Sequence, residues 1–402
     1  MHGLPWVDLP GGTETSLGIW ITAVGAVAFV VGVWVSRNVR VPAVWTANLV
    51  RPTVRFWIFC VATGLGSAYV LLPMFNVASL SAVLNALSLV WTLGVLLGLR
   101  HAILSRRPAA ALGWCVVLLA NPLLILVYSG FLGYGSMAII ICVSGLVPAI
   151  RRWPVFAALS VVGVYLGLSL FVSYFSIRDD IRYVAWSSAS MGSKFDATME
   201  IAGAASWFDI RNYDHADYLD QRLNQNYFVG LSAERLAAGQ VEWFRGQSFV
   251  DGLIAMIPRI VWPEKPLGGG SGRLVADLTG LDLSYDSSFG VGNVLELYAN
   301  FGWPSLIAGF LGLGWVLGRL DLRAAIAERE GRYRPLLVSY LIAVGLIQPN
   351  GSIVELTAWT VSAWLAGHAA GWLWTQLEHR RLRSAGGSPA YPTPYAPPAA
   401  RA

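Results

Sequence analysis

Residues 78–107 read ASLSAVLNALSLVWTLGVLLGLRHAILSRR, an apolar run that ends in a cluster of basic residues. The run from Ala78 to Leu99 is long enough to cross the hydrocarbon core of a membrane, which takes about 20 helical residues. Arginine near the end of such a helix favours the cytoplasmic side. The stretch therefore predicts a membrane helix whose carboxyl end, at Arg100 to Arg107, is cytoplasmic.

The same pattern recurs along the chain and sets the predicted topology. Of all residues 55% are hydrophobic and 13% charged, whereas soluble domains average about 25% charged residues, so we expect an all-α, polytopic membrane protein. Outside one hydrophilic stretch, basic clusters fall where cytoplasmic helix ends are expected, which predicts an external N-terminus and a cytoplasmic C-terminus. About nine membrane helices are expected, at residues 17–36, 56–75, 78–99, 110–128, 134–150, 155–175, 303–317, 336–348 and 353–374.

The hydrophilic stretch divides the chain into four predicted parts. Residues 1–176 hold the first six membrane helices, and residues 177–288 form one large external, periplasmic loop with short amphipathic helices. Residues 289–383 hold a re-entrant segment and the last membrane helices. Residues 384–402 are rich in Pro, Ala and Gly and predict a disordered cytoplasmic tail. The net charge of +5 does not indicate nucleic-acid binding, because charges of both signs are mixed in the loop.

The end of the loop carries the strongest chemical signal. Gly290 and Gly292 open a helix on which Asn293, Glu296 and Asn300 share one face. A carboxylate beside a membrane requires a reason, because its desolvation is costly when it is unpaired. Two interpretations are open for Glu296. It pairs with an arginine that locks the loop to the bundle, or it serves as a catalytic base or acceptor-binding group.

Three other titratable residues are weaker candidates. Glu355, at the outer end of the last helix, is expected near a cavity in either a hydrogen-bonding or a catalytic role. His215 is the only histidine of the loop and is expected to be a surface residue or a general base. Asp286 is a further candidate base. Asp214 and Asp217 flank His215 without a second histidine or a cysteine, so no metal and no cofactor are predicted.

Basic residues at the membrane edge form the other half of the predicted site. Guanidinium groups suit phosphate because they bind it through two parallel hydrogen bonds. Arg178 and Arg182 lie four residues apart above the sixth helix, and Arg259, Lys265 and Arg273 surround a proline-rich turn. Each is a candidate ligand for a lipid-linked diphosphate and, equally, a candidate salt-bridge partner for the acids of the loop.

Two segments resemble the bacterial oligosaccharide repeat-unit polymerases, the Wzy-type polymerases of O-antigen and exopolysaccharide. They are RIVWPEKP at residues 259–266 and SSFGVGNVLELYANFGW at residues 287–303. The resemblance implies a metal-independent, GT-C-like glycosyltransferase in the bacterial inner (plasma) membrane. It would polymerise undecaprenyl-diphosphate-linked oligosaccharide at the periplasmic face, with membrane lipid, chain-length regulators and flippases as partners. The motif E-x-Y-x-N-F-G falls on Glu296, Tyr298, Asn300, Phe301 and Gly302.

Under this hypothesis Glu296 is the preferred base for the acceptor hydroxyl, ahead of His215 and Asp286, and arginines stabilise the departing diphosphate. Tyr298 and Asn300 would orient sugar hydroxyls. An O-antigen ligase, which differs in its acceptor, and a non-catalytic anchor of a polysaccharide-synthesis complex stay open. A transporter or flippase is disfavoured, because the first six helices carry no ionisable residue outside their cytoplasmic ends.

Overall fold

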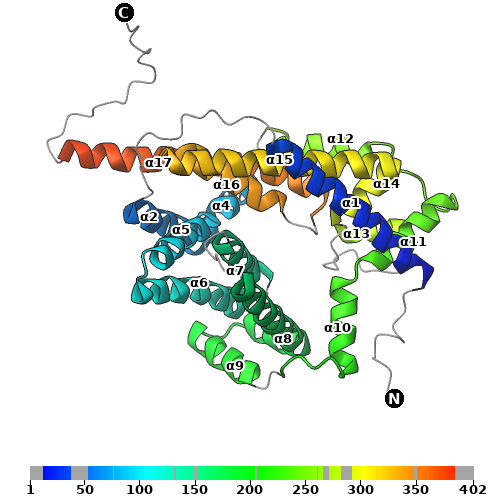
Figure 1. The fold of residues 1–402 in the computed structure, drawn as a ribbon, viewed down its shortest axis with the longest axis horizontal. Helices are drawn as coiled ribbons and strands as arrows, with labels where there is room; N and C mark the ends of the chain where they lie inside the picture. The colour runs from blue at the N-terminus through cyan, green and yellow to red at the C-terminus, as the bar shows by residue number, and fades with distance from the viewer. Residues whose placement is uncertain are drawn as a thin grey trace, which may run out of the picture.

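The structure is a computed structural model, and it is all-helical in the residues that it describes (Figure 1). Six of its helices are long and apolar enough to cross a membrane, so the chain is a multi-pass helical membrane protein. The described residues are 12–37, 53–75, 77–130, 133–147, 153–203, 206–259, 261–265, 271–281, 292–347 and 351–384.

The N-terminal part holds five of the six long apolar helices. Two of these spans are interrupted: one passes through a π-helical turn, and the other breaks between Ser88 and Val90. Its elements are α1 (Thr13–Arg37), α2 (Val54–Gly66), η2 (Ser67–Leu71), α3 (Leu72–Met74), α4 (Ala78–Ser88), α5 (Val90–Leu104), α6 (Pro108–Ser129), α7 (Gly133–Leu146) and α8 (Trp153–Ala185).

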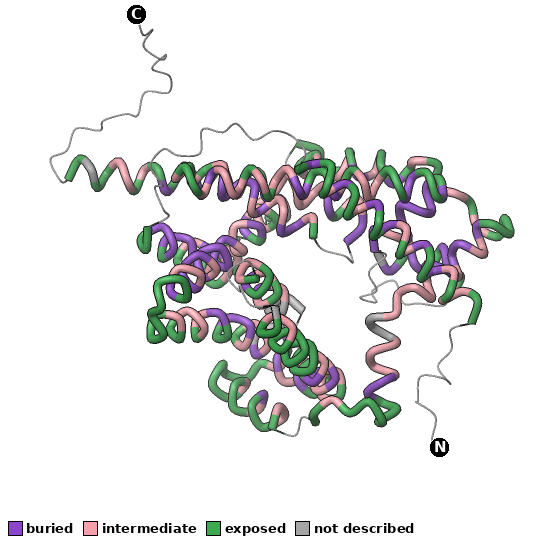
Figure 2. The backbone as a smooth tube through the Cα atoms, in the orientation of Figure 1, coloured by how far each residue is buried: buried purple, intermediate pink, exposed green. Residues whose placement is uncertain are grey.

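The hydrophilic stretch is helical, and one boundary differs from the expected one. Helix α8 does not end near Phe175 but continues to Ala185, so Arg178 and Arg182 lie on its last turns. Its apolar half is largely exposed (Figure 2), as expected for a helix that faces lipid. The helices that follow are α9 (Met191–Gly203), α10 (Tyr213–Leu223), α11 (Asn226–Ala237), α12 (Gln247–Ala255), α13 (Ser271–Thr279) and α14 (Gly292–Phe301).

Three C-terminal helices complete the fold: α15 (Trp303–Arg329), α16 (Tyr333–Leu346) and α17 (Ile353–Ser384). Helix α1 packs along α15 although the two are far apart in sequence, and α16 packs between α15 and α17 (Figure 1). The predicted tail at residues 384–402 lies, apart from Ser384, outside the described residues.

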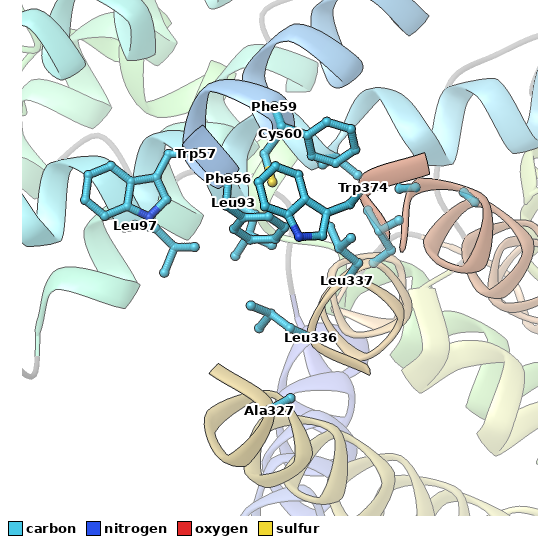
Figure 3. Close-up of a cluster of buried hydrophobic side chains, with 14 of the residues drawn as sticks. Phe56, Trp57, Phe59, Cys60, Leu93, Leu97, Ala327, Leu336, Leu337 and Trp374 are labelled. Carbon is cyan, nitrogen blue, oxygen red and sulfur yellow. The ribbon is translucent and has the colours of Figure 1, made fainter. Parts of the chain in front are cut away.

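An aromatic core joins the two halves of the molecule (Figure 3). Phe56, in the first turn of α2, lies 4.3 Å from the ring of Tyr333 and 5.2 Å from that of Trp374. Arg100 of α5 forms an ion pair with Glu328 at the end of α15. These contacts bring helix ends rich in arginine together at one end of the bundle.

Candidate functional site

Helix α14 packs among helices of both ends of the chain and is buried along most of its length. From Gly292 to Asn300 each residue is buried except Val294, which is half-buried. Helices α1, α11, α12 and α15 pack around it. The helix ends at Gly302, whose φ of 66° lies in the left-handed region that favours glycine, and α15 begins at the next residue. The three polar residues predicted to share one face, Asn293, Glu296 and Asn300, are all buried.

Glu296 has no exposed surface. Its Oε2 accepts a hydrogen bond of 2.6 Å from the backbone N–H of Ile353, the first residue of α17. Its Oε1 is also buried, and the Ser248 hydroxyl lies beside the carboxyl. The arginine partner that one interpretation required does not occur among the described ion pairs. A helix N-terminus holds one side of the carboxylate, and the other side is free to accept a proton.

The surroundings of Glu296 raise the pKa of its carboxyl to a value near neutral pH. Burial raises its pKa from 4.5 to about 7, because the charged form loses its hydration. The Ile353 N–H and the Ser248 hydroxyl favour the charged form, whereas the charges of Glu355 and Asp251 oppose it. A carboxyl with a pKa near the working pH is suited to general acid or base chemistry.

Asn300 organises the loop beside α14. Its Oδ1 accepts from the backbone N–H of Gly246 at 3.0 Å. Its Nδ2 donates to the Ser248 hydroxyl at 2.7 Å and to the Glu296 carbonyl oxygen at 2.8 Å. Both donors of the amide are therefore used within the protein, so Asn300 acts as a positioning residue here. It ties residues 246–248 to the helix that carries Glu296.

We expect Asn300→Leu to destabilise the protein by about 2–3 kcal/mol, because it leaves the Gly246 N–H and the Ser248 hydroxyl without their partner in a buried site. Thermal unfolding in detergent measures the change. Asn224→Leu is the matched control, since Asn224 is less buried and its side chain donates one hydrogen bond, to Asp220. Equal melting temperatures for Asn300→Leu and the wild type would contradict this role.

A shallow cavity of about 250 Å³ adjoins this network. Trp243, Arg245, Asn300 and Phe301 line it. Phe301 is exposed and Arg245 has no carboxylate within ion-pair distance in the described part of the chain. The backbone of Arg245 has a positive φ of 48°. Its N–H donates to the Asn300 carbonyl oxygen, and this hydrogen bond fixes the backbone there. Sequence reasoning missed Arg245, because only a contact across 55 positions places it here.

The proline-rich turn after α12 holds two of the predicted cations close together. Arg259 donates to the carbonyl oxygens of Pro263 and Lys265. The Lys265 ammonium donates to the carbonyl oxygens of Ala255 and Ile257, at 3.0 and 2.9 Å. Burial, and then the charge of Arg259, lower the pKa of Lys265. Neither cation has a carboxylate within ion-pair distance among the described residues.

Glu355 has a clear structural role at the start of α17. Its carboxylate accepts from the Ser352 N–H at 3.1 Å, and the Ser352 hydroxyl accepts from the Glu355 N–H at 3.2 Å. This reciprocal pair is a capping box, which stabilises the first turn of a helix. It fixes the N-terminus that holds Glu296. Helix α12 packs on the same turn, where the Thr357 hydroxyl donates to the Gly252 carbonyl oxygen at 2.8 Å.

The remaining predicted residues lie elsewhere or are not described. Arg178 pairs with Asp179 at 3.0 Å, and both it and Arg182 belong to α8, which packs with α6, α9 and α10. Helix α8 and these neighbours lie apart from α14 (Figure 1). Arg273 pairs with Asp277. Asp286 lies outside the described residues.

His215 is buried, so it does not lie at the surface, as one interpretation of the sequence predicted. Its Nδ1 accepts from the Asp209 N–H at 3.0 Å, and its Nε2 lies 3.3 Å from the Ser206 hydroxyl. Tyr298 is also buried, with its ring 6.0 Å from that of Trp243 and 5.6 Å from that of Trp303.

These features define a multi-pass helical membrane protein whose helices enclose a buried carboxylate. The chain belongs to the family described as Domain of unknown function (DUF8712), whose model matches residues 19–270. The match therefore includes α12 and the Arg259–Lys265 turn and ends before α14. No curated protein and no solved structure matches the chain.

Proposed function

We propose that this protein is a glycosyltransferase that joins lipid-diphosphate-linked oligosaccharide repeat units into a polysaccharide. The observation that carries the proposal is the Glu296 carboxyl, which is buried, raised in pKa to about 7 and without an ion-pair partner among the described residues. An acceptor sugar hydroxyl needs a base to remove its proton as it attacks the donor. Such a base typically accelerates the reaction by about 10²–10⁴-fold.

The segments on either side of α12 supply other groups that this reaction needs. Arg245 lines the cavity, and Arg259 and Lys265 lie on the turn that follows α12. Fixed cations without a carboxylate partner suit the negative charge that grows on a departing diphosphate. Trp243 and the exposed Phe301 give the cavity aromatic faces against which a sugar ring can pack. We place the donor diphosphate beside these cations and the acceptor in the cavity.

The apolar face of α12 supports a position at the membrane surface. Phe249, Val250 and Leu253 are exposed, whereas Ser248 and Gly252 on the other face are buried. A short helix with one apolar face lies well in the membrane interface. A lipid-linked diphosphate has its charged group at the same depth.

The proposal includes the finer topology. Helices α7, α16 and α17 complete nine membrane passages, in addition to the six long apolar helices. The convergence of arginine-rich helix ends at one end of the bundle supports a cytoplasmic C-terminus and an external N-terminus. The Glu296 site would then face the periplasm from the inner membrane, in a GT-C-like architecture.

Analysis of lipid-linked glycans in a strain that lacks the gene tests this function. We expect single repeat units on undecaprenyl diphosphate to accumulate, and the wild-type gene to restore long chains. Accumulation of unligated long chains would instead indicate a ligase. Accumulation of single units on the cytoplasmic face would indicate a flippase.

Arg245→Gln is expected to raise the KM for the lipid-diphosphate donor by about tenfold, because a charge-assisted hydrogen bond contributes on the order of 1.5–3 kcal/mol. Donor titration with the purified enzyme measures this. Arg211→Gln is the matched control, since Arg211 is also an exposed loop arginine but lies outside the cavity. An equal KM for both variants would remove Arg245 from the site.

A further inference from the structure

A second polar cluster lies on α15, α16 and α17, far from Glu296. Arg334 of α16 donates from Nε to Nδ1 of His368 at 2.7 Å. Arg323 of α15 is near enough to act electrostatically on the same imidazole. His368 is about 22 Å along α17 from Ile353, at about 1.5 Å per residue. His368 therefore lies near the middle of α17, level with the first turn of α16, which carries Arg334.

Close packing of α16 on α17 positions Arg334. A Cβ atom on Gly371 would lie 2.7 Å from Cγ of Arg334, and one on Gly367 would lie 2.7 Å from Cα of Val338. Only glycine at these two positions lets the arginine stem lie against α17. The guanidinium is thus held beside His368 by the fold, while its remaining N–H groups stay exposed.

The cluster lacks a carboxylate partner. No described carboxylate lies within ion-pair distance of Arg323 or Arg334. Asp321 lies on the same helix as Arg323, but residues two apart on a helix do not face each other. The other nearby acids pair with different arginines: Glu328 with Arg100, Glu330 with Arg332, and Glu378 with Arg381.

Tryptophans surround the cluster as they do at a membrane interface. Trp364 is 49% exposed, and its ring lies 4.5 Å from that of His368. Trp372 is 61% exposed one turn further along α17. Exposed tryptophan is typical of the headgroup level of a bilayer. The cations therefore lie where lipid phosphates lie.

We propose that Arg323, Arg334 and His368 form a binding site for a phosphate group, carried by an anionic phospholipid or present as free phosphate. Because Nδ1 of His368 accepts from Arg334, the proton of the neutral ring is on Nε2, which can donate to phosphate. The two guanidinium groups supply charge and further donors. Basic pockets between membrane helices on the cytoplasmic side bind anionic headgroups in this way. The site is independent of the Glu296 chemistry.

Native mass spectrometry of the delipidated, purified protein tests the lipid source. Wild type should retain phosphatidylglycerol in preference to phosphatidylcholine. The double variant Arg323→Gln/Arg334→Gln should bind phosphatidylglycerol about thirtyfold more weakly. The matched control Arg332→Gln/Arg383→Gln removes two exposed arginines at the same end of the bundle and should bind like the wild type.

Thermal unfolding with inorganic phosphate in lipid-free detergent tests the other source. A stabilisation that the double variant loses and the control keeps supports a site for free phosphate. The single variant Arg323→Gln changes one exposed side chain and keeps the test valid if the double variant misfolds. It should bind phosphatidylglycerol about fivefold more weakly than the wild type. Equal binding of phosphatidylglycerol and equal response to phosphate in wild type and both cluster variants would overturn the proposal.

Discussion

Glu296→Gln is expected to reduce glycosyl transfer by about 10²–10⁴-fold, because the amide cannot take the proton of the acceptor hydroxyl. The substitution keeps the size of the side chain and an oxygen that accepts from the Ile353 N–H. Single-turnover rates with purified enzyme and lipid-linked repeat units measure the effect. Glu200→Gln, on an exposed residue of α9, is the matched control and should retain the wild-type rate.

The pH dependence of the same reaction follows from the raised pKa of Glu296. The base is active when ionised, so the wild-type rate should fall about tenfold per pH unit below a pH of about 7 and level off above it. The residual rate of Glu296→Gln should lack this dependence. A wild-type rate that stays constant from about two pH units below this pKa to about one unit above it would exclude Glu296 as the base.

Stability should change in the direction opposite to activity. Because the folded-state pKa of about 7 lies above the usual 4.5, the ionised carboxyl destabilises the fold above pH 7 by about 3 kcal/mol. This cost disappears as the pH falls from about 7 to about 4.5, so wild type gains stability over that window. Glu296→Gln should therefore melt at a higher temperature than wild type at pH 8. A lower melting temperature would show that the ionised carboxylate stabilises the start of α17 as a helix cap.

The helical membrane class could be predicted from the sequence because it depends on local composition. Apolar runs and the arginines beside them do not depend on tertiary contacts, and six of the expected spans have long apolar helices in the structure. The shared face of Asn293, Glu296 and Asn300 was likewise a local pattern, and all three side chains are buried. The end of α8 was misplaced, because a polar helix can continue an apolar one without a break in the chain.

The composition of the site depends on long-range contacts that no local pattern reveals. Glu296 meets the backbone of Ile353, and Asn300 meets Gly246 and Ser248. The two ends of the loop were expected to meet, but α8 and α14 pack against different helices. Spacing cannot distinguish an arginine that faces a cavity, such as Arg245, from one that pairs with its neighbour, such as Arg178.

Gly230→Val is expected to destabilise the protein by on the order of 3 kcal/mol or more, because a Cβ there would overlap the carbonyl oxygen of Glu14. Gly18 of α1 approaches the Asn226 carbonyl oxygen equally closely, and the Thr22 hydroxyl donates to the Asn226 side chain at 2.7 Å. The yield and melting temperature in detergent should both fall. Gly203→Val is the control, since no atom lies within 4 Å of a Cβ at that exposed position.

The effect should extend to the site, because α11 supports α14 directly. If valine pushes α11 away from α1, the packing that buries Glu296 loosens and water reaches the carboxyl. The pKa of Glu296 should then return toward 4.5 and the pH–rate profile should shift to lower pH. A Gly230→Val protein with wild-type yield, melting temperature and pH profile would show that the contact between α1 and α11 does not hold the site. The expected result makes the first membrane helix a structural part of the site, although it contributes no reacting group.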